Sequence, residues 1–399
     1  MGIYIVCQLA LSIMLTAVFC LGSVVNPSVA NATEYYVATT GNDGNPGTQS
    51  QPFRTINKGV SVLKPSDTLY IRQGTYTENI GYGASLPSGT SWANPITISA
   101  YSGETVTISG YVALSTGVPA SYLIFDHLTV TDGQFYIGAD SHHIRFQNGE
   151  VVGRADNNAV QGLGAYVEVL KSKIHDAGGY GFYMKGQNGL YDGNEVYNNA
   201  GYGFHIFSSG NNNVNNNILR NNYIHNNGGR VTNVGVTGGI ILASGSNNIA
   251  YNNIICGQVN GYGIQIAYTN GGTNNQVYNN TIYSNDLAGI YIDPTAPNSI
   301  INNNIIYNNG SGIVDGGATG TVLSNNLTTD PKFVNVSAND FSLQASSPAI
   351  NAGMTISVVT TDMKGVARPQ GAAYDIGAYE YSQGTTPLPA PNNLRAVVQ

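Results

Sequence analysis

Charged side chains are scarce in this sequence: only 9% of its 399 residues are Asp, Glu, Lys or Arg, and the formal net charge is −7. Proteins that bind nucleic acid need a basic stripe or patch, so this composition excludes nucleic acid as a partner. Residues 231–331 contain no Lys, Arg or His. A positively charged site on the repeats must therefore use residues 140–230. The cationic and His residues of that segment are Arg145, Arg154, Lys171, Lys173, Lys185, Arg220, Arg230, His142, His143, His175, His205 and His225.

Cysteine is also scarce. Two of the three cysteines lie in an almost wholly apolar stretch, residues 3–25, which leaves Cys256 alone in the rest of the chain. The fold therefore does not depend on disulfide bonds, and a Cys-x-x-Cys metal or redox site is excluded. The apolar stretch is followed by Ala30-Asn31-Ala32, which is typical of a signal-peptide cleavage site. We expect residues 1–32 to be a signal peptide, although no Lys or Arg precedes the apolar stretch; an uncleaved membrane anchor is the alternative, and the remainder is exported in either case.

A short segment with alternating apolar residues, first seen at Gly179–Lys185, recurs along the chain. The first apolar residue of each copy stands at positions 182, 204, 240, 264, 290 and 313, so the steps are 22, 36, 24, 26 and 23 residues. A period in this range indicates a solenoid, in which each repeat packs mainly on its neighbours. The alternation indicates a strand with one face inward, and the spacing leaves no room for a crossover helix. We therefore predict an all-β fold, a parallel β-helix whose strands stack one coil above another.

A second column of residues supports this register. An Asn before an aliphatic block recurs at Asn194, Asn222, Asn253, Asn280, Asn304 and Asn326. Asn tolerates turn conformations, and its amide can donate and accept along a stack of identical neighbours. We therefore predict an Asn ladder at a corner of the coil.

Residues 33–381 form the expected solenoid domain. Near its start, Ile56, Val60 and Leu63 recur at helical spacing, which predicts a short helix that caps the apolar end of the first coil. Residues 382–399 are expected to be a Pro-rich linker and a truncated C-terminal tail. The tail resembles the start of a fibronectin type III module.

Both ends of the solenoid domain resemble those of known proteins. The segments Tyr35–Val37, Gly41–Gly44, Pro52–Ile56 and Asp67–Tyr76 resemble the opening of secreted bacterial right-handed β-helix proteins, and Ser347–Gly353 and Asp375–Tyr381 resemble their closing segment. These proteins form the pectate-lyase-like superfamily, which includes polysaccharide lyase family nine and related β-helix glycoside hydrolases. The resemblance implies a right-handed parallel β-helix of about ten coils in an exported protein that acts on polysaccharide. Because different activities share these segments, the reaction stays open.

Membership of family nine would imply a catalytic Lys on a strand and a calcium site of clustered Asp. Here Lys185 lies three residues after Phe182 rather than directly after it, and only Asp156, Asp176 and Asp192 are nearby. We therefore carry over no calcium ligand. The sequence assigns no cofactor and leaves calcium open.

Two columns of polar residues are expected to be structural. Glu150, Lys173 and Glu195 take the same position in successive coils, about 4.8 Å apart, and should form a charge ladder. A neighbouring column, expected to pack at a corner, contains His175, Tyr197, His225, Cys256, Tyr283 and Tyr307.

The outward face of the repeated strand is the candidate active site. Tyr183 and Lys185 point outward from one copy, His205 and Phe207 point outward from the next, and Tyr183 and His205 become direct neighbours. A long insertion follows, and insertions on one edge of a solenoid commonly form the wall of a binding groove. We predict Lys185, His205 and Tyr183 as catalytic residues. The predicted substrate-binding residues are Arg230, Arg154, Tyr180 and Tyr202.

This set suits β-elimination on a uronic-acid polymer. The reaction needs a cation that neutralises the uronate carboxylate and a base that removes the C5 proton. A desolvated lysine near other cations can serve as the base, so we assign that role to Lys185 and the cation to His205 or Arg230. The expected partner is a pectate-like acidic polysaccharide. We expect an extracellular monomer with no membrane partner once the signal peptide is removed.

Two other classes stay open. A glycoside hydrolase needs two carboxyl groups about 5 to 9.5 Å apart; Asp293 and Asp315 end equivalent strands of adjacent coils, with Asp286 close by. This acidic trio lies about four coils, roughly 19 Å, from Lys185. A non-catalytic glycan-binding surface protein would instead use a stacking ladder of Tyr180, Tyr202 and Tyr262.

Overall fold

The computed structural model describes residues 32–82, 85–114, 117, 119–208, 214–229 and 236–382. These residues belong to one compact unit, Ala32–Gln399. The expected signal peptide lies outside the described residues apart from Ala32, and the expected linker and tail lie outside them apart from Ser382. No helix in the described part of the chain is long and apolar enough to cross a membrane.

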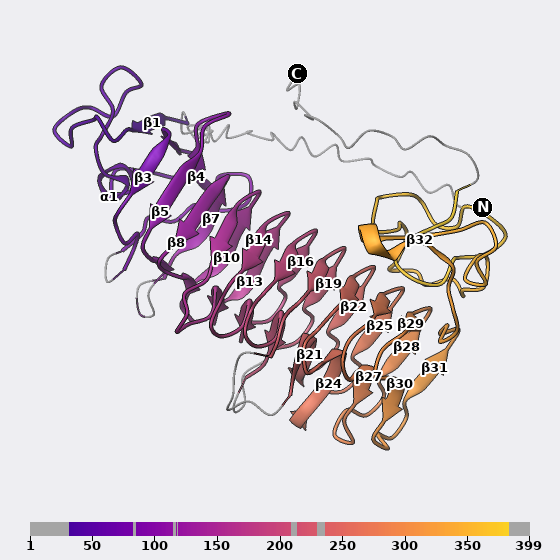
Figure 1. Cartoon of the computed structure of the whole chain (residues 1–399). Coiled ribbons are helices and arrows are strands. Elements are labelled where there is room, and N and C mark those ends of the chain that lie inside the picture. The colour runs from indigo at the N-terminus through magenta and orange to yellow at the C-terminus, as the bar shows by residue number, and fades with distance from the viewer. Residues whose placement is uncertain are drawn as a thin grey trace, which may run out of the picture. The chain divides into compact units, whose positions relative to one another are not determined.

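Three parallel β-sheets surround one core (Figure 1). Sheet A has twelve strands: β1 (Glu34–Val37), β2 (Thr68–Ile71), β4 (Ile96–Ala100), β7 (Ser121–Asp126), β10 (His142–Gln147), β13 (Ala165–Leu170), β16 (Leu190–Asp192), β19 (Ile218–Arg220), β22 (Ile249–Tyr251), β25 (Gln276–Tyr278), β28 (Ile300–Asn302) and β31 (Val322–Ser324). Sheet B has ten strands: β3 (Gly74–Tyr76), β5 (Val106–Ser109), β8 (Leu128–Thr131), β11 (Glu150–Val152), β14 (Lys173–His175), β17 (Glu195–Tyr197), β20 (Tyr223–His225), β23 (Ile254–Cys256), β26 (Thr281–Tyr283) and β29 (Ile305–Tyr307). Sheet C has nine strands: β6 (Val112–Leu114), β9 (Phe135–Ile137), β12 (Val160–Gly162), β15 (Phe182–Met184), β18 (Phe204–Ile206), β21 (Thr237–Gly245), β24 (Gly261–Gly271), β27 (Ala288–Ile292) and β30 (Ser311–Asp315).

From β4 onward, each turn adds one strand to sheets A, B and C in that order. Sheet C therefore counts the complete turns, of which there are about nine rather than the ten expected from the sequence. The prediction of an all-β parallel β-solenoid is confirmed. After the last turn the chain forms an antiparallel hairpin of β32 (Phe333–Asn335) and β33 (Asp340–Leu343), joined through the 3₁₀-helix η1 (Val336–Ala338).

The predicted capping helix is not seen. The described residues contain one α-helix, α1 (Ile56–Val60), with five residues. Ile56 and Val60 are buried, and Gly59 lies against Val37 and Leu69. A helix of this length spans only about 7.5 Å, which is too short to cover the end of a coil with three sheets.

The core alternates with the strands as predicted. Phe182 and Phe204 are fully buried in β15 and β18, and their rings stack with centroids 4.3 Å apart and planes 3° apart. Tyr183 and His205 are paired in register and only partly buried. Phe207 follows β18 on the outward side and is also partly buried. The inward and outward assignments at these two turns are therefore confirmed.

Each corner of the coil is built from two consecutive residues with different roles. Between sheets A and B the pairs are Asn221-Asn222, Asn252-Asn253, Asn279-Asn280, Asn303-Asn304 and Asn325-Asn326. The first residue of each pair has a left-handed backbone, with φ between 49° and 60°. Asn accepts this conformation more readily than other residues with a side chain, apart from Asp. The second residue directs its side chain into the coil.

The inward residues form the predicted Asn ladder. Asn222 Oδ1 accepts hydrogen bonds from the backbone N and from Nδ2 of Asn194, each at 3.0 Å. Asn222 Nδ2 donates to Tyr191 O and to Asn253 Oδ1, each at 2.9 Å. The same pattern continues through Asn280, Asn304 and Asn326. Equivalent ladders at the other two corners contain Asn199, Asn227, Gln258, Asn285 and Asn309, and Asn217, Asn248 and Asn275.

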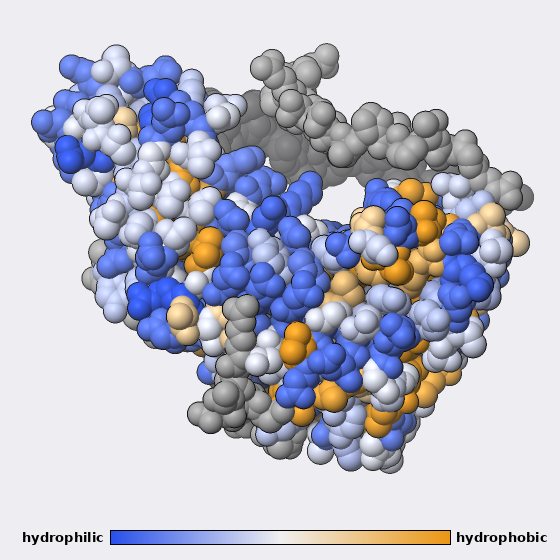
Figure 2. Space-filling model, in the orientation of Figure 1, coloured by the Kyte–Doolittle hydropathy of each residue, from blue (hydrophilic) through white to orange (hydrophobic). Residues whose placement is uncertain are grey.

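The outward Asn residues of the A–B corner hold the closing segment, residues 330–382, against the solenoid. Their Nδ2 atoms donate from Asn252 to Thr361 O, from Asn279 to Asp375 O, from Asn303 to Met354 O and from Asn325 to Ala352 O, at 2.7 to 3.0 Å. Phe333, Phe341 and Ile376 of the segment belong to a buried cluster with Cys256. Figure 2 shows hydrophobic residues gathered toward this end of the face in view.

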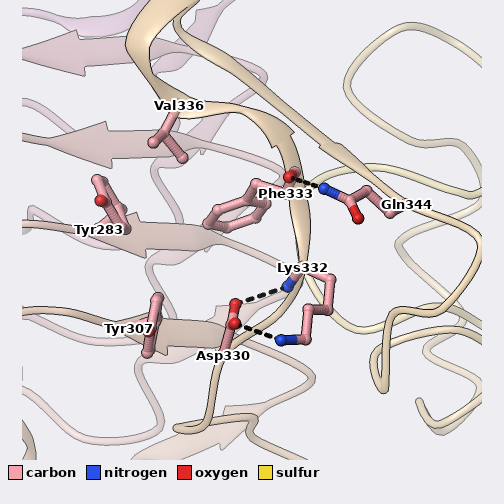
Figure 3. A pocket seen from close by; sticks show the side chains of 7 residues that line it. All are labelled: Tyr283, Tyr307, Asp330, Lys332, Phe333, Val336 and Gln344. Atoms are coloured by element: carbon pink, nitrogen blue, oxygen red, sulfur yellow. Dashed lines mark hydrogen bonds and ion pairs between the residues drawn. The ribbon is translucent and has the colours of Figure 1, made fainter.

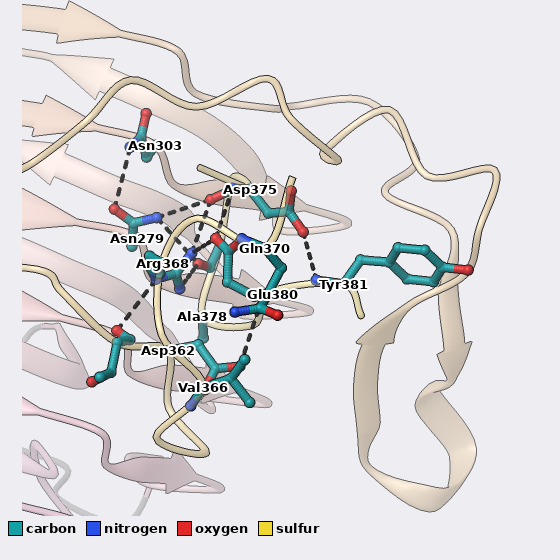
Figure 4. Close-up of polar contacts among 12 residues, drawn as sticks. Asn279, Asn303, Asp362, Val366, Arg368, Gln370, Asp375, Ala378, Glu380 and Tyr381 are labelled. Atoms are coloured by element: carbon teal, nitrogen blue, oxygen red, sulfur yellow. Dashed lines mark hydrogen bonds and ion pairs between the residues drawn. The ribbon is translucent and has the colours of Figure 1, made fainter. Parts of the chain in front are cut away.

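A buried ion pair fixes the closing segment (Figure 4). Arg368 Nη1 lies 2.6 Å from Glu380 Oε1, and both side chains are fully buried. The other guanidinium N–H groups donate to backbone carbonyls of the segment and to Asn252 Oδ1, at 2.8 to 3.3 Å. Because every donor is satisfied, the charge is stable in a dry site only while the segment keeps this conformation.

Phe204→Asp is expected to destabilise the middle turns by at least about 4 kcal/mol, because it buries an unpaired carboxylate. Phe207→Asp, on the outward side, is expected to cost about 1 to 2 kcal/mol. Urea unfolding followed by circular dichroism measures both, and equal losses would contradict the in/out register.

Asn222→Ala is expected to cost about 3 kcal/mol, because it leaves the buried amide groups of Asn194 and the carbonyl of Tyr191 without their partner. Asn216→Gly is the matched control: Asn216 is exposed and left-handed, with φ of 59°, and Gly adopts that conformation freely. Thermal melts of the two variants should therefore differ clearly. Similar melting temperatures would show that the ladder contributes little.

Candidate functional site

The outer face of sheet C at β15 and β18 carries a cluster of aromatic rings around His205. The ring of Tyr183 lies 5.1 Å from that of His205. The ring of Phe207 stacks on His205 at 5.3 Å and lies 6.4 Å from that of Tyr183. Tyr180 meets the imidazole edge to face at 4.6 Å, and Tyr202 lies 5.5 Å away. The structure therefore brings together four of the predicted site residues, two of which come from the corner that precedes the strands.

Tyr180 and Tyr202 determine the environment of His205. Tyr202 Oη donates to Gln265 Oε1 at 2.8 Å, which holds the buried Tyr202 ring beside His205 on the outer side of the sheet. Burial, together with the positive charge of Lys185, lowers the pKa of His205 to about 4. The imidazole is therefore neutral at pH 7, and its buried Nδ1 has no hydrogen-bond partner among the described residues. That His205 or Arg230 supplies the cation stays a prediction, and a neutral imidazole favours Arg230 for this role.

Lys185 follows β15 directly and is half-buried. Its Nζ lies 4.7 Å from the centroid of the Tyr183 ring, a cation–π contact. Among the described residues it has no ion pair, whereas four other cations of the middle turns are paired with carboxylates. These pairs are Arg145–Glu168, Arg154–Asp156, Lys173–Glu195 and Arg220–Asp192. Lys185 is thus available to an anionic ligand.

The two arginines predicted to bind substrate have different outcomes. Arg154 lies on the corner before β12, where its Nε donates to Asp156 Oδ1 at 2.9 Å and its Nη1 to Asp132 O at 3.3 Å. In the described part of the chain Arg154 has no contact with the His205 cluster. Asp156 neutralises its charge. Arg230 lies outside the described residues, and its role remains a prediction.

The residues do not fit a calcium site. Calcium takes six to eight oxygen ligands, mostly from clustered carboxylates. No group of three or more His, Cys, Asp or Glu that could hold a metal exists among the described residues. The carboxylates nearest in sequence are engaged elsewhere: Asp156 with Arg154, Asp176 with His175 and Asp192 with Arg220.

The acidic trio has structural contacts. Asp315 is paired in register with Ile292, not with Asp293, so the expected equivalence of the two Asp residues is off by one position. Asp293 Oδ1 accepts from the backbone N of Thr295, and Asp315 Oδ1 accepts from the backbone N of Gly317. Asp286 Oδ2 likewise accepts from the backbone N of Asn260. Asp293 and Asp315 thus stabilise local turns, and Asp286 links two successive coils.

The outer face of sheet B confirms the two predicted columns. Glu150, Lys173 and Glu195 are consecutive partners in the sheet. The His175, Tyr197 and His225 rings stack with centroids 4.5 and 5.1 Å apart, and His175 Nε2 lies 3.0 Å from Glu150 Oε1. The column is thus a structural stack with its own carboxylate partners.

A pocket of about 400 Å³, not predicted from the sequence, lies at the end of this column (Figure 3). Tyr283 and Tyr307 line it on sheet B, and the Asp330–Lys332 ion pair lies on its other side. The Tyr column was visible in the sequence. The opposite wall was not, because residues 330–344 return to sheet B only through the fold of the closing segment.

Comparison with known proteins agrees with this architecture. A family described as "Pel9A-like, right handed beta helix region" matches residues 35–240, and one described as "Right handed beta helix region" matches residues 154–328. The pectate lyase PEL9 of Emericella nidulans is 37% identical over 79 residues, which are 20% of this chain and 19% of that protein. The uncharacterized protein YwoF of Bacillus subtilis is 39% identical over 75 residues, which are 19% of this chain and 15% of that protein. The chain thus matches less than a fifth of the length of either relative.

Solved structures extend the likeness over most of the chain. Pectate lyase Pel9A superposes with a TM-score of 0.69 and 20% identity, covering 89% of this chain and 98% of that one. A rhamnogalacturonan lyase has a TM-score of 0.50, 15% identity and coverage of 84% and 99%. At such identities the likeness shows the fold alone. The Pel9A-like match spans more than half of the sequence, and the chain therefore belongs to the Pel9A-like right-handed β-helix family, in the superfamily of pectate lyase family nine.

Proposed function

We propose that the protein is an exported polysaccharide lyase that cleaves a pectate-like uronan by β-elimination on the outer face of sheet C. The observation that carries this proposal is the unpaired, half-buried Lys185 ammonium beside a neutral His205 and several tyrosine rings. An amine with no carboxylate partner can meet an acidic sugar without breaking an existing ion pair. The printed names of two similar proteins, pectate lyase PEL9 and pectate lyase Pel9A, favour the same substrate class.

In the proposed reaction the Lys185 ammonium first gives up a proton to solvent, and the neutral amine then removes the proton from C5 of the uronate. The electrons of the C5–H bond form the C4=C5 double bond, and the C4–O bond breaks. The departing oxygen takes up a proton, so the products are a new non-reducing end with a double bond and a free hydroxyl. Proton removal by a positioned amine contributes through proximity and base strength.

The neutral imidazole of His205 suits a hydrogen-bonding role toward a sugar hydroxyl. Tyr183 separates Lys185 from His205 and offers a ring to the sugar, since aromatic side chains combine an apolar surface with a polar tip. The uronate carboxylate is then neutralised by Arg230, as predicted from the sequence, or by a cation from solution.

Lys185→Ala is expected to abolish turnover, at least about a hundredfold in kcat, while changing substrate affinity little, because the base acts only in the transition state. Lys171→Ala is the control, since Lys171 is an exposed cation at another corner. Release of unsaturated uronic ends is followed by ultraviolet absorbance on pectate and alginate. Full activity of Lys185→Ala would show that Lys185 is not the base.

The same assay separates the other classes. New reducing ends without ultraviolet absorbance, lost in Asp293→Ala, would identify a hydrolase. Binding without any turnover would identify a glycan-binding surface protein.

The depressed pKa of His205 predicts a pH-dependent stability. The folded protein keeps His205 neutral to about pH 4, whereas the unfolded chain binds a proton near pH 6.5. Protonation thus favours the unfolded state, so stability present above about pH 6.5 falls as the pH drops toward 4. His205→Gln should remove this pH-dependent part of the stability. At pH 5 the melting temperature of the variant should therefore approach that of the wild type. Parallel pH curves for the two proteins would contradict the buried neutral imidazole.

A further inference from the structure

Three aromatic residues occupy a backbone position at which the chain otherwise places Asn. At the corner between sheets C and A, one residue of each turn from β7 to β28 has a left-handed backbone. In successive turns these residues are Tyr122, His143, Tyr166, Asn188, Asn216, Asn247, Asn274 and Asn298, with φ between 54° and 59°. The left-handed conformation is unfavourable for bulky side chains. The three aromatic side chains therefore occupy a strained position that Asn fills in five other turns.

The strained residues form one stack. The rings of Tyr122 and His143 lie 4.6 Å apart, and those of His143 and Tyr166 lie 4.5 Å apart with planes 8° apart. These separations match the spacing of stacked strands, so the ring faces look along the solenoid axis. Trp92, the single Trp of the chain, meets the edges of the first two rings at 5.6 and 6.0 Å. Arg145 covers Trp92 at 4.5 Å. The stack is therefore held rigidly from one side.

Tyr166 ends this stack and leaves one ring face open. The next residue of the column is the much smaller Asn188, so the corner surface has a step one ring deep. No ring of the described residues other than His143 contacts Tyr166, and 44% of its surface is exposed. A large aromatic side chain in a strained backbone, with a free face, is the arrangement expected of a binding platform.

The step is continuous with the site on sheet C. Tyr166 N donates to Gln187 O at 2.9 Å, and Lys185 N donates to Gly162 O at 2.6 Å in the same pair of turns. A molecule that rests on the open face of Tyr166 therefore lies over the corner that Lys185, Gln187 and Asn188 form. The C–H face of a pyranose ring is flat and apolar, and its hydroxyl groups can reach Gln187 and Asn188.

We propose that the open face of Tyr166 is a sugar-binding subsite that holds one pyranose of an acidic polysaccharide, adjacent to the ring bound at Lys185. This inference deepens the proposed function and rests on it for the identity of the polymer. The subsite is reached only by chains long enough to extend from Lys185 around the corner. It therefore contributes to the binding of polymers and not of the shortest fragments.

The test replaces Tyr166 by the residue that the chain itself uses at this corner. Tyr166→Asn should lower affinity for polygalacturonate about three- to tenfold and leave affinity for digalacturonate unchanged, measured by calorimetry. Relief of backbone strain and loss of one ring contact should offset each other, so the melting temperature should stay within about 4 °C of the wild type. Tyr166→Phe should bind as the wild type does. Tyr82→Asn, which alters an exposed Tyr elsewhere, should also have no effect.

Unchanged polygalacturonate affinity in a folded Tyr166→Asn protein would overturn the subsite. So would a fall of more than about 10 °C in melting temperature, because the stack would then be a structural element. Failure of the proposed function would give another result: the wild type would bind polygalacturonate without cleaving it. The affinities of the wild type and Tyr166→Asn for the polymer would then still test the subsite. If the wild type bound neither polygalacturonate nor alginate, the inference would fall with its polymer.

Discussion

The two-residue Asn corner is the constraint on which the rest of the structure depends. The chain must bend sharply at three corners in every turn. A tight bend needs a left-handed residue, followed by a residue whose side chain satisfies the backbone groups inside the bend. Asn222 does the second task with four hydrogen bonds. Because the ladder fixes the register of every strand, it also fixes which side chains point outward. The site on sheet C and the contacts of the closing segment both follow from it.

The parts of the fold that repeat were predictable from the sequence. Alternation in Phe204 and its neighbours reports the two faces of a strand, and the recurring Asn reports the corner. Departures from the repeat were not predictable. Helix α1 is only five residues long, because helical spacing of apolar residues does not set length. The one-position offset of Asp315 from Asp293, by contrast, was already present in the repeat spacing, because Ile290 pairs with Ile313 and Asp315 therefore pairs with Ile292.

The sequence predicted which side chains of the candidate site are neighbours, but not the charge states of those side chains. The repeat spacing placed Tyr183 beside His205, as the structure has them. The neutral state of His205 depends on Tyr180 and Tyr202, which enter from the preceding corner, and on the bond from Tyr202 to Gln265 two turns along the column. Burial of this kind arises between coils and leaves no local signal. The neutralised Arg154 did leave one, since Asp156 stands only two residues away.

A solenoid separates the demands of folding from those of chemistry. The inward positions and ladder amides are filled alike in turn after turn, whereas the outward positions carry no such requirement. Outward residues that differ from the equivalent residues of other turns are therefore the ones that point to function. Lys185 is half-buried and has no ion pair among the described residues, whereas Arg145, Arg154 and Arg220 are paired. Lys171 also lacks an ion pair there but is exposed at another corner. Tyr166 departs from the Asn pattern of its corner. Lys185 and Tyr166 fall on adjacent turns of a single corner, so the two departures present one continuous surface to a ligand.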